Sequence, residues 1–260
     1  MITIDTLTQS AIKLLKNLIE TPSFSSEEDP TALLLERWFQ SFEIPYNRYQ
    51  NNVWATNKSF DTAKPTLLLN SHHDTVKPNS GYTKNPFDAH IEDGKLYGLG
   101  SNDAGGCLVS LLATFTYFYD RDSLAYNLVF VGSAEEESSG PNGLNSMLSI
   151  VPKIDVAIVG EPTQMHLAVA EKGLVVFDVE VSGTPSHAAH PNENNALYNA
   201  IPVMEWIKTY QFEQESEALG RVKMTLTQIN AGQQHNAVPA KVVMVVDVRV
   251  NDCYSNAQIV

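Results

Sequence analysis

Short apolar runs that end directly in histidine or carboxylate residues recur three times in the first part of the chain. They cover residues 66–70, 126–131 and 155–159, and they lead into the sequences SHHD, AEEE and GEPT. The first two runs are typical of buried strands of a parallel sheet, and the third is also expected to be a strand. Such sheets bind ligands beyond the carboxyl ends of their strands. The sequence therefore predicts an α/β domain with reactive side chains gathered at one sheet edge.

Helices are expected before and between these strands. Apolar residues recur at helical spacing in residues 12–19, ahead of a stop at Thr21-Pro22, and again in residues 30–42. A third helix is predicted at residues 104–119, and Asp93-Gly94 predicts a tight hairpin turn ahead of it. Alternating strands and helices indicate a mostly parallel mixed sheet between helices.

The pattern changes at about residue 167. Residues 175–181 alternate strictly, which predicts a half-exposed antiparallel strand. A helix and two more alternating strands follow, at residues 195–210, 222–229 and 241–250. This β-α-β-β order predicts an incomplete α+β domain, so we expect a catalytic metal-binding domain at residues 1–168 and a second domain at 169–260. The last residues resemble the first turn of a helix, and we expect this chain to be the N-terminal portion of a longer protein.

Charge and cysteine content limit the partners. The chain has 30 acidic and 17 basic residues and a net charge of -13, which argues against a nucleic acid or an anionic membrane as partner. Its two cysteines form no CxxC pair, so neither a disulfide framework nor a thiolate zinc site is expected. No run has the form of a signal peptide or a transmembrane helix, and we expect a cytoplasmic protein.

The polar residues at the strand ends are of the types that bind metals. Imidazole nitrogen and carboxylate oxygen are ligands that zinc accepts. The candidate ligands are His72, Asp103, Glu137 and Glu161. Asp74, two residues after His72, faces the same side of a strand and can fix the imidazole, whereas His73 faces the other way. A carboxylate such as Asp103 can bridge two cations, and Glu136 can take a proton from a bound water.

Each of these residues also has an ordinary structural explanation. Asp103 fits a helix N-cap, three adjacent glutamates fit a solvated edge, and Glu161 fits a loop. His187 and His190, in GTPSHAAHP, fit an exposed polar loop. The coincidence of so many candidates at strand ends favours a metal site.

Taken together, these motifs resemble those of the co-catalytic zinc amidohydrolases, which include acetylornithine deacetylase, succinyl-diaminopimelate desuccinylase, aminoacylase and carboxypeptidase G. SHHDTV resembles the His-x-Asp motif of that family, and LYGLGSND resembles its Gly-rich approach to a bridging aspartate. AEEE resembles its paired acids, and VGEPT resembles its last carboxylate ligand. The resemblance spans nearly the whole chain and implies a zinc-peptidase-like catalytic domain with an inserted lid domain.

The resemblance also implies roles for individual residues. Two zinc ions are expected, for which cobalt can substitute, with Asp103 as the bridge. His72 and Glu161 would bind one ion and Glu137 the other. Glu136 would be the general base, and Asp74 would orient His72.

In the second domain, the resemblance makes His187 the lid histidine that stabilises the developing oxyanion in a neighbouring subunit. It makes Asn236 and Arg249 substrate-binding residues, and the domain itself the dimerisation domain of a homodimer. Two usual residues of the family differ here, an Arg replaced by Leu99 and a Lys replaced by Gly105. The histidine of the second metal comes, in that family, from a segment after the lid.

The resemblance therefore predicts a zinc-dependent hydrolase that cleaves the amide bond of an N-acyl amino acid. N-acetylornithine is the first substrate expected, because VGEPT, EKG and SGTPSHAAHP are most similar to the deacetylase branch. That substrate would place the chain in arginine biosynthesis. Alternatives within the family are a di- or tripeptide aminopeptidase and succinyl-diaminopimelate desuccinylase. An alternative of another class is a non-catalytic metal-binding or dimerisation fragment.

Overall fold

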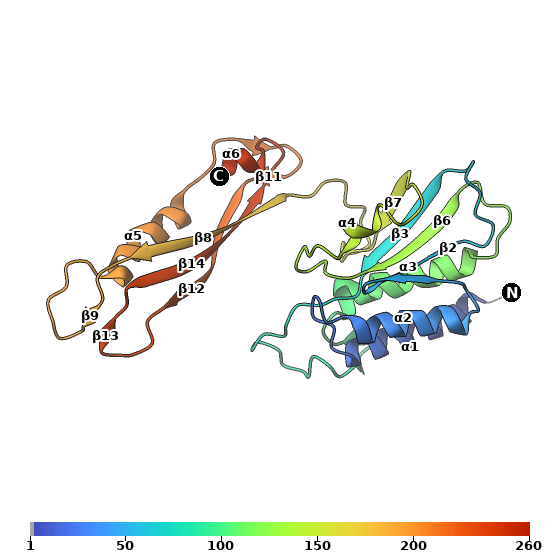
Figure 1. Ribbon diagram of the computed structural model, residues 1–260, viewed down its shortest axis with the longest axis horizontal. Coiled ribbons are helices and arrows are strands. Elements are labelled where there is room, and N and C mark those ends of the chain that lie inside the picture. The colour runs from blue at the N-terminus through green and yellow to red at the C-terminus, as the bar shows by residue number, and fades with distance from the viewer. Residues whose placement is uncertain (1–2) are drawn as a thin grey trace. The chain divides into compact units, whose positions relative to one another are not determined.

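The computed structural model describes residues 3–260 and divides the chain into two compact units, Met1–Met165 and His166–Val260 (Figure 1). Within the described residues, no helix is both long enough and apolar enough to span a membrane. The mixed α/β architecture expected from the sequence is present in the first unit, and an α+β arrangement is present in the second.

A five-stranded mixed sheet forms the centre of the first unit. Its strand order is β1-β2-β6-β3-β7. The strands are β1 (Asn47–Tyr49), β2 (Asn52–Thr56), β3 (Thr66–His72), β6 (Asn127–Ser133) and β7 (Val156–Val159). β3 is parallel to both β6 and β7, whereas β2 is antiparallel to β6 and to β1. The apolar runs of the sequence thus form the parallel part of the sheet.

Three helices cover one face of this sheet, as Figure 1 shows. They are α1 (Ile4–Glu20), α2 (Asp29–Ser41) and α3 (Gly106–Phe118), and the short α4 (Leu144–Met147) packs on the other face. Phe39, Phe115 and Phe130 join two of these helices to β6, with ring centroids 5.9–6.2 Å apart. Each of these rings is fully buried and contributes about 3 kcal/mol through burial. This aromatic cluster fixes the helices on the sheet.

A hairpin leads from the sheet to the turn that carries Asp103. β4 (His90–Glu92) and β5 (Lys95–Tyr97) pair across Asp93 and Gly94, which have φ values of 50° and 75°, as the Asp-Gly signal predicts. The following segment, η1 (Ser101–Gly105), is not a regular helical turn, because Asp103 and Ala104 have non-helical backbone angles. The helix predicted from residue 104 therefore begins only at Gly106, and Asp103 is not its N-cap.

The second unit has a three-stranded antiparallel sheet in the order β12-β14-β8. Its main elements are β8 (Gly173–Ser182), α5 (Ala196–Thr209), β12 (Lys223–Ala231) and β14 (Lys241–Val250). Val175, Phe177 and Val179 pack into the core beside α5, so the predicted alternation of β8 is confirmed. Shorter elements complete the unit, namely β9 (Ser186–His187), β10 (Glu215–Ser216), β11 (Gly220–Arg221), β13 (Ala237–Val238) and α6 (Asn256–Ile259).

Gly98 is the position in the Gly-rich segment where a side chain is least tolerable. Its φ is 146°, and a Cβ there would lie 2.2 Å from Cγ2 of the buried Ile19. We expect Gly98→Ala to lower the free energy of unfolding by on the order of 3 kcal/mol, because strain and overlap act together. Gly94→Ala is the matched control. Its φ is 75° with no atom within 4 Å of a Cβ, so strain alone should lower the free energy by about 1 kcal/mol. Equal losses in urea denaturation would contradict this account.

Candidate metal centre

The candidate ligands lie at one edge of the central sheet. His72 is the last residue of β3, Glu137 follows β6, and Glu161 follows β7. Since these three strands are parallel, their carboxyl ends meet at the same edge. Asp103 reaches that edge from η1. The strand-end pattern of the sequence thus becomes a single cluster in the fold.

The imidazole of His72 is the centre of this cluster. Its Nε2 lies 3.1 Å from Oδ1 of Asp103, 3.8 Å from Oε2 of Glu136 and 3.9 Å from Oε2 of Glu161. Ligand atoms of His72, Asp103 and Glu137 all lie within 4.8 Å of one another. The His72 side chain is fully buried, whereas those of Asp103 and Glu136 are 55% and 54% exposed. One side of the cluster is therefore open to solvent.

These distances and donor types fit a bound divalent cation. Two ligand atoms about 2.1 Å from a tetrahedral zinc ion lie about 3.4 Å from each other. The separations of His72 Nε2 from the Asp103 and Glu161 oxygens, 3.1 and 3.9 Å, lie on either side of that value. Carboxylate and imidazole donors are accepted by zinc and by other first-row metals. The division of ligands between two ions stays a prediction.

The electrostatics of the cluster also favour a cation. Burial alone would lower the pKa of His72, but its hydrogen bond to Asp74 and the surrounding carboxylates outweigh burial and raise the pKa to about 9. Burial and neighbouring carboxylates raise the pKa of Glu161 to about 7, against the opposing effect of His72. Burial and the same crowding raise the pKa of Glu137. Without a metal, protons would therefore stabilise the cluster.

Asp74 does more than orient His72. His72 Nδ1 lies 3.0 Å from the Asp74 carbonyl oxygen and 3.3 Å from its Oδ1. The backbone amides of Glu136 and Glu137 donate to Oδ1 and Oδ2 of Asp74, each at 3.1 Å. Ser25 Oγ donates to Oδ2 at 2.8 Å. Burial opposes ionisation of Asp74, but these hydrogen bonds outweigh it and hold the pKa below its usual range.

His73 belongs to the interior and not to the metal cluster. Its Nδ1 lies 2.8 Å from Oγ1 of Thr31, and its Nε2 lies 3.0 Å from the carbonyl oxygen of Asn51. Burial lowers its pKa, which favours the neutral ring. The prediction that His73 faces away from His72 is therefore confirmed.

Sequence reasoning missed the residues behind the ligands. Ser25 binds Asp74, and the buried Glu28 accepts a hydrogen bond from the backbone amide of Glu135. Both lie in TPSFSSEED, a polar stretch immediately before α2. Such stretches usually mark a helix start, so the local pattern gives no reason to look for longer contacts. Only the structure shows that Glu28 occupies the N-cap position of α2 without forming a capping hydrogen bond.

The Gly-rich approach departs from the resembled family in two residues, and each has a local explanation. Leu99 is buried. At Gly105, a Cβ would lie 2.5 Å from the carbonyl oxygen of Gly100 and 2.7 Å from Cδ1 of Leu15. The backbone of this chain has no room there for a lysine side chain.

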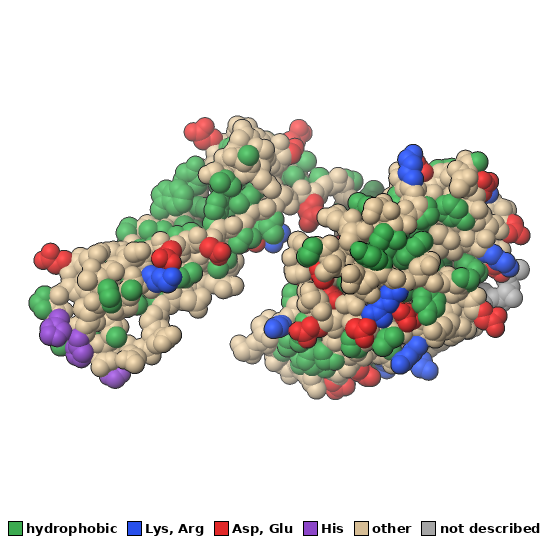
Figure 2. Space-filling model, in the orientation of Figure 1, with side chains coloured by type: hydrophobic (Ala, Val, Ile, Leu, Met, Phe, Trp, Pro, Cys, Tyr) green, Lys and Arg blue, Asp and Glu red, His purple; other side chains and the backbone are tan. Residues whose placement is uncertain are grey.

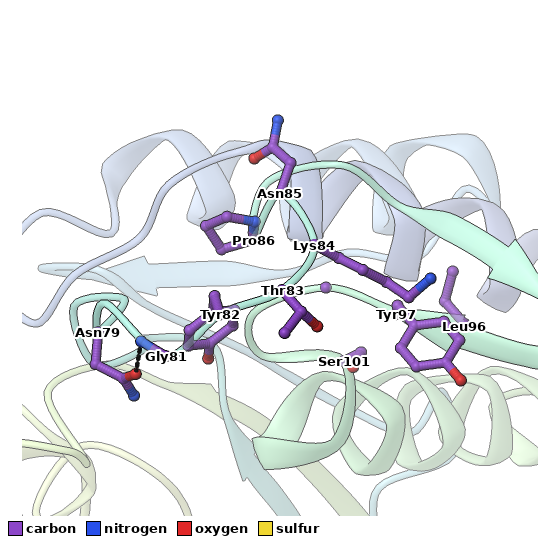
Figure 3. A pocket seen from close by; sticks show the side chains of 11 residues that line it. Asn79, Gly81, Tyr82, Thr83, Lys84, Asn85, Pro86, Leu96, Tyr97 and Ser101 are labelled. Carbon is purple, nitrogen blue, oxygen red and sulfur yellow. Dashed lines mark hydrogen bonds between the residues drawn. The ribbon is translucent and has the colours of Figure 1, made fainter.

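A pocket of about 400 Å³ lies next to this segment (Figure 3). It is lined by the loop at residues 79–86, by β5 and by Ser101, two residues before Asp103. Lys84 lies over the ring of Tyr97, 4.6 Å from its centroid, and pairs with Glu92. The volume is typical of a small-molecule site, and the lining offers hydroxyl and amide groups. The charge of Lys84 is already balanced within the protein.

The remaining predicted site residues lie in the second unit. His187 is in β9, which pairs with β13, and the amide of Ala188 donates to the carbonyl oxygen of Asn236 at 2.9 Å. The structure thus brings His187 and Asn236 together at one end of this unit, where Figure 2 shows histidine side chains gathered. Arg249 lies near the C-terminal end of β14, roughly 27 Å along the strand from Lys241 at its other end. It donates to both carboxylate oxygens of Asp247.

Comparisons with known proteins identify relatives of this chain and of its fold. The model of a family described as Peptidase family M20/M25/M40 matches residues 68–239. A succinyl-diaminopimelate desuccinylase of Rickettsia bellii is 26% identical over 93% of this chain, which spans 66% of that relative's length. Two solved structures share the fold. An M20 family metallo-carboxypeptidase from Sulfolobus solfataricus has a TM-score of 0.70 and 18% identity, over 98% of this chain and 74% of its own. A dinuclear metal-binding M20 peptidase of Bacillus subtilis has a TM-score of 0.62 and 15% identity, over 99% of this chain and 67% of its own.

The raised pKa of His72 predicts how stability depends on pH in metal-free protein. The folded pKa of about 9 exceeds the unfolded value of about 6.5, so protonation of His72 stabilises the fold fully below pH 6.5. That contribution is lost as the pH rises from 6.5 to 9. With chelator present, we expect Tm to fall by on the order of 5 °C between pH 7 and pH 9.

Two variants separate this cause from general alkaline destabilisation. His72→Gln should lose most of the fall in Tm, because no imidazole remains to titrate. His90→Gln, at an exposed histidine of β4, should retain it. An unchanged fall in His72→Gln would show that the cluster is not responsible.

Proposed function

This chain belongs to peptidase family M20/M25/M40, and from that membership and its metal centre we propose that it hydrolyses the amide bond of an N-acyl amino acid. The observation that carries the proposal is the convergence of three carboxylates from separate segments on Nε2 of one buried histidine. The chain spans about two thirds of the length of the desuccinylase relative, and its activity is therefore a proposal.

Zinc is the metal that we propose for the site, as two ions bridged by Asp103. His72 and Glu161 would hold one ion and Glu137 the other. When bound, such ions polarise a carbonyl oxygen and lower the pKa of a coordinated water. The dinuclear Bacillus subtilis peptidase supports the number of ions, and the donor set supports their type.

Glu136 is the residue that we propose to move protons. Its carboxylate lies at the open side of the cluster, 3.8 Å from Nε2 of His72 and half exposed. It would take a proton from the attacking water and return that proton to the leaving amine. Its backbone amide is held by the buried Asp74, so the carboxylate extends from a fixed point. The same Asp74 orients the imidazole of His72.

For the second unit we propose the roles of lid and dimerisation domain. His187 would donate a hydrogen bond to the developing oxyanion, in the site of a neighbouring subunit. Asn236, which lies beside it, would contact substrate. Arg249 would pair with a substrate carboxylate after exchanging its present partner, Asp247.

The acyl group and amino acid require a substrate panel. N-succinyl-diaminopimelate is the first to test, because the Rickettsia bellii relative is named a desuccinylase. N-acetylornithine is the second, because the VGEPT and SGTPSHAAHP patterns resemble the deacetylase branch. Di- and tripeptides are the third, since the solved structures of this fold include peptidases. The highest kcat/KM in the panel identifies the substrate class.

Glu136→Gln tests the proposed general base. The variant keeps the shape of the side chain and removes its ability to accept a proton, so kcat should fall by about 10²–10⁴-fold. Zinc content should stay near that of the unmodified protein, because Glu136 is not a proposed ligand. Glu27→Gln, at an exposed glutamate outside the cluster, is the control and should keep full activity. Turnover retained by Glu136→Gln would rule out this role.

Zinc analysis separates the enzyme from a non-catalytic metal-binding fragment. We expect at least one zinc equivalent per chain after dialysis. His72→Gln should lose bound zinc, because the variant removes the imidazole beside which Asp103 and Glu161 both lie. A folded protein that holds no zinc would overturn the metal centre. Zinc binding without hydrolysis of any panel substrate would favour the non-catalytic alternative.

A further inference from the structure

Glu28 is a fully buried residue with a carboxylate side chain. It lies directly before α2, in the N-cap position, but its side chain caps no amide of that helix. The nearby Arg48 directs its guanidinium to Asp29, Glu36 and Asn51. A buried acidic side chain needs hydrogen-bond donors in place of water. Those of Glu28 come from the neighbouring Ser26 and from two distant residues, Asn51 and Glu135.

Three donors satisfy the Glu28 carboxylate. Its Oε1 accepts from the backbone amide of Ser26 at 2.7 Å and from that of Glu135 at 3.1 Å. Its Oε2 accepts from Nδ2 of Asn51 at 2.8 Å. The bond to Glu135 crosses 107 positions of sequence and ends one residue before Glu136. Glu28 thus connects the start of α2 to the loop that follows β6.

That loop has a backbone that requires support. Glu135 has a φ of 54°, in the left-handed region that residues with a Cβ rarely adopt. Its own carboxylate accepts from the amide of Asn142 at 3.0 Å and from Nδ2 of Asn142 at 2.9 Å. Beyond it, the amides of Glu136 and Glu137 donate to Asp74. Three successive amides are therefore held by two buried acids, Glu28 and Asp74.

We propose that Glu28 is a positioning residue, whose carboxylate fixes the backbone of Glu135 so that Glu136 and Glu137 extend into the metal centre. It touches neither metal nor substrate and acts through the loop. Asp74 alone cannot fix the backbone at Glu135, because it accepts hydrogen bonds only from the amides of Glu136 and Glu137 in this loop. Glu28 supplies the bond on the preceding residue. The kinetic part of this inference rests on the proposed function, and its structural part does not.

Two substitutions of Glu28 test the inference in the full chain. Glu28→Gln keeps one acceptor oxygen but turns the NH2 group of its amide toward at least one of the three donors. Glu28→Met keeps a similar length and removes both acceptors. Glu36→Gln is the matched control, since Glu36 lies in the helix that follows Glu28, is largely buried and contacts Arg48 instead of the loop. Circular dichroism and Tm establish that each variant is folded.

Hydrogen exchange of the backbone amides at residues 135–137 is the direct readout. We expect exchange to accelerate by about tenfold in Glu28→Gln and further in Glu28→Met, because a bond to a charged acceptor is weakened or lost. The affinity for Zn²⁺, measured by titration, should fall by about tenfold, since supports of ligand residues act on binding at that scale. Glu36→Gln should stay within about twofold of the unmodified protein in both measurements.

The kinetic readout distinguishes positioning from loss of stability. With the best substrate of the panel, kcat of Glu28→Gln should fall by about tenfold at unchanged KM, because a misplaced base slows chemistry and not binding. The inference would be overturned by a folded Glu28 variant that has a lower Tm but keeps the exchange rates and Zn²⁺ affinity of the unmodified protein. If Glu28→Met does not fold, Glu28→Gln decides. If the unmodified chain hydrolyses nothing, the proposed function fails, and exchange and Zn²⁺ affinity still decide the role of Glu28.

Discussion

The parallel pairing of β3 with both β6 and β7 is the constraint on which the rest of the first unit depends. His72 lies opposite Ser133 in β6, and Asn70 lies opposite Val159 in β7. In this register the three strands end nearly level, so the residues that follow them reach a common point. A slip of one residue would turn each side chain to the opposite face of the sheet. The aromatic packing of α2 and α3 against β6 stabilises this arrangement of strands.

The sheet edge gathers mutually repelling groups, and hydrogen bonds compensate for only part of the repulsion. His72 is surrounded by carboxylates, which is why its pKa rises despite burial. Buried acids that are not ligands have hydrogen-bond donors from the backbone, as Asp74 and Glu28 do. The ligand carboxylates have few such donors and remain partly exposed. The protein thus separates the acids that maintain its structure from those left free to bind a cation.

Apolar runs predicted β3 and β6 because both strands are buried, whereas β7 was predicted as a strand although it lies at the sheet edge with all its residues exposed. The continuous apolar runs became the parallel strands, the strict alternation of residues 175–181 became the inner face of β8, and Asp93-Gly94 became the hairpin turn. What the sequence could not predict depends on contacts between distant segments. The regular helix expected from residue 104 is displaced because the chain at Asp103 and Ala104 is drawn out of helical geometry. Glu28 had no local signal, since its role arises only when α2 and the loop after β6 are folded together.

The pocket beside η1 is lined by residues that do not support the candidate metal centre. Its loop at residues 79–86 is exposed along nearly its whole length and supplies none of the candidate ligands or their buried supports. Glu28, Asp74 and Glu135 hold different amides of one loop, so the effects of substitutions in these residues are interdependent and restrict neutral drift. Among the described residues, no side chain of the loop bonds to these three acids; Lys84 pairs instead with Glu92. Residues 79–86 can therefore change one at a time, which reshapes the pocket while the candidate metal centre stays unchanged.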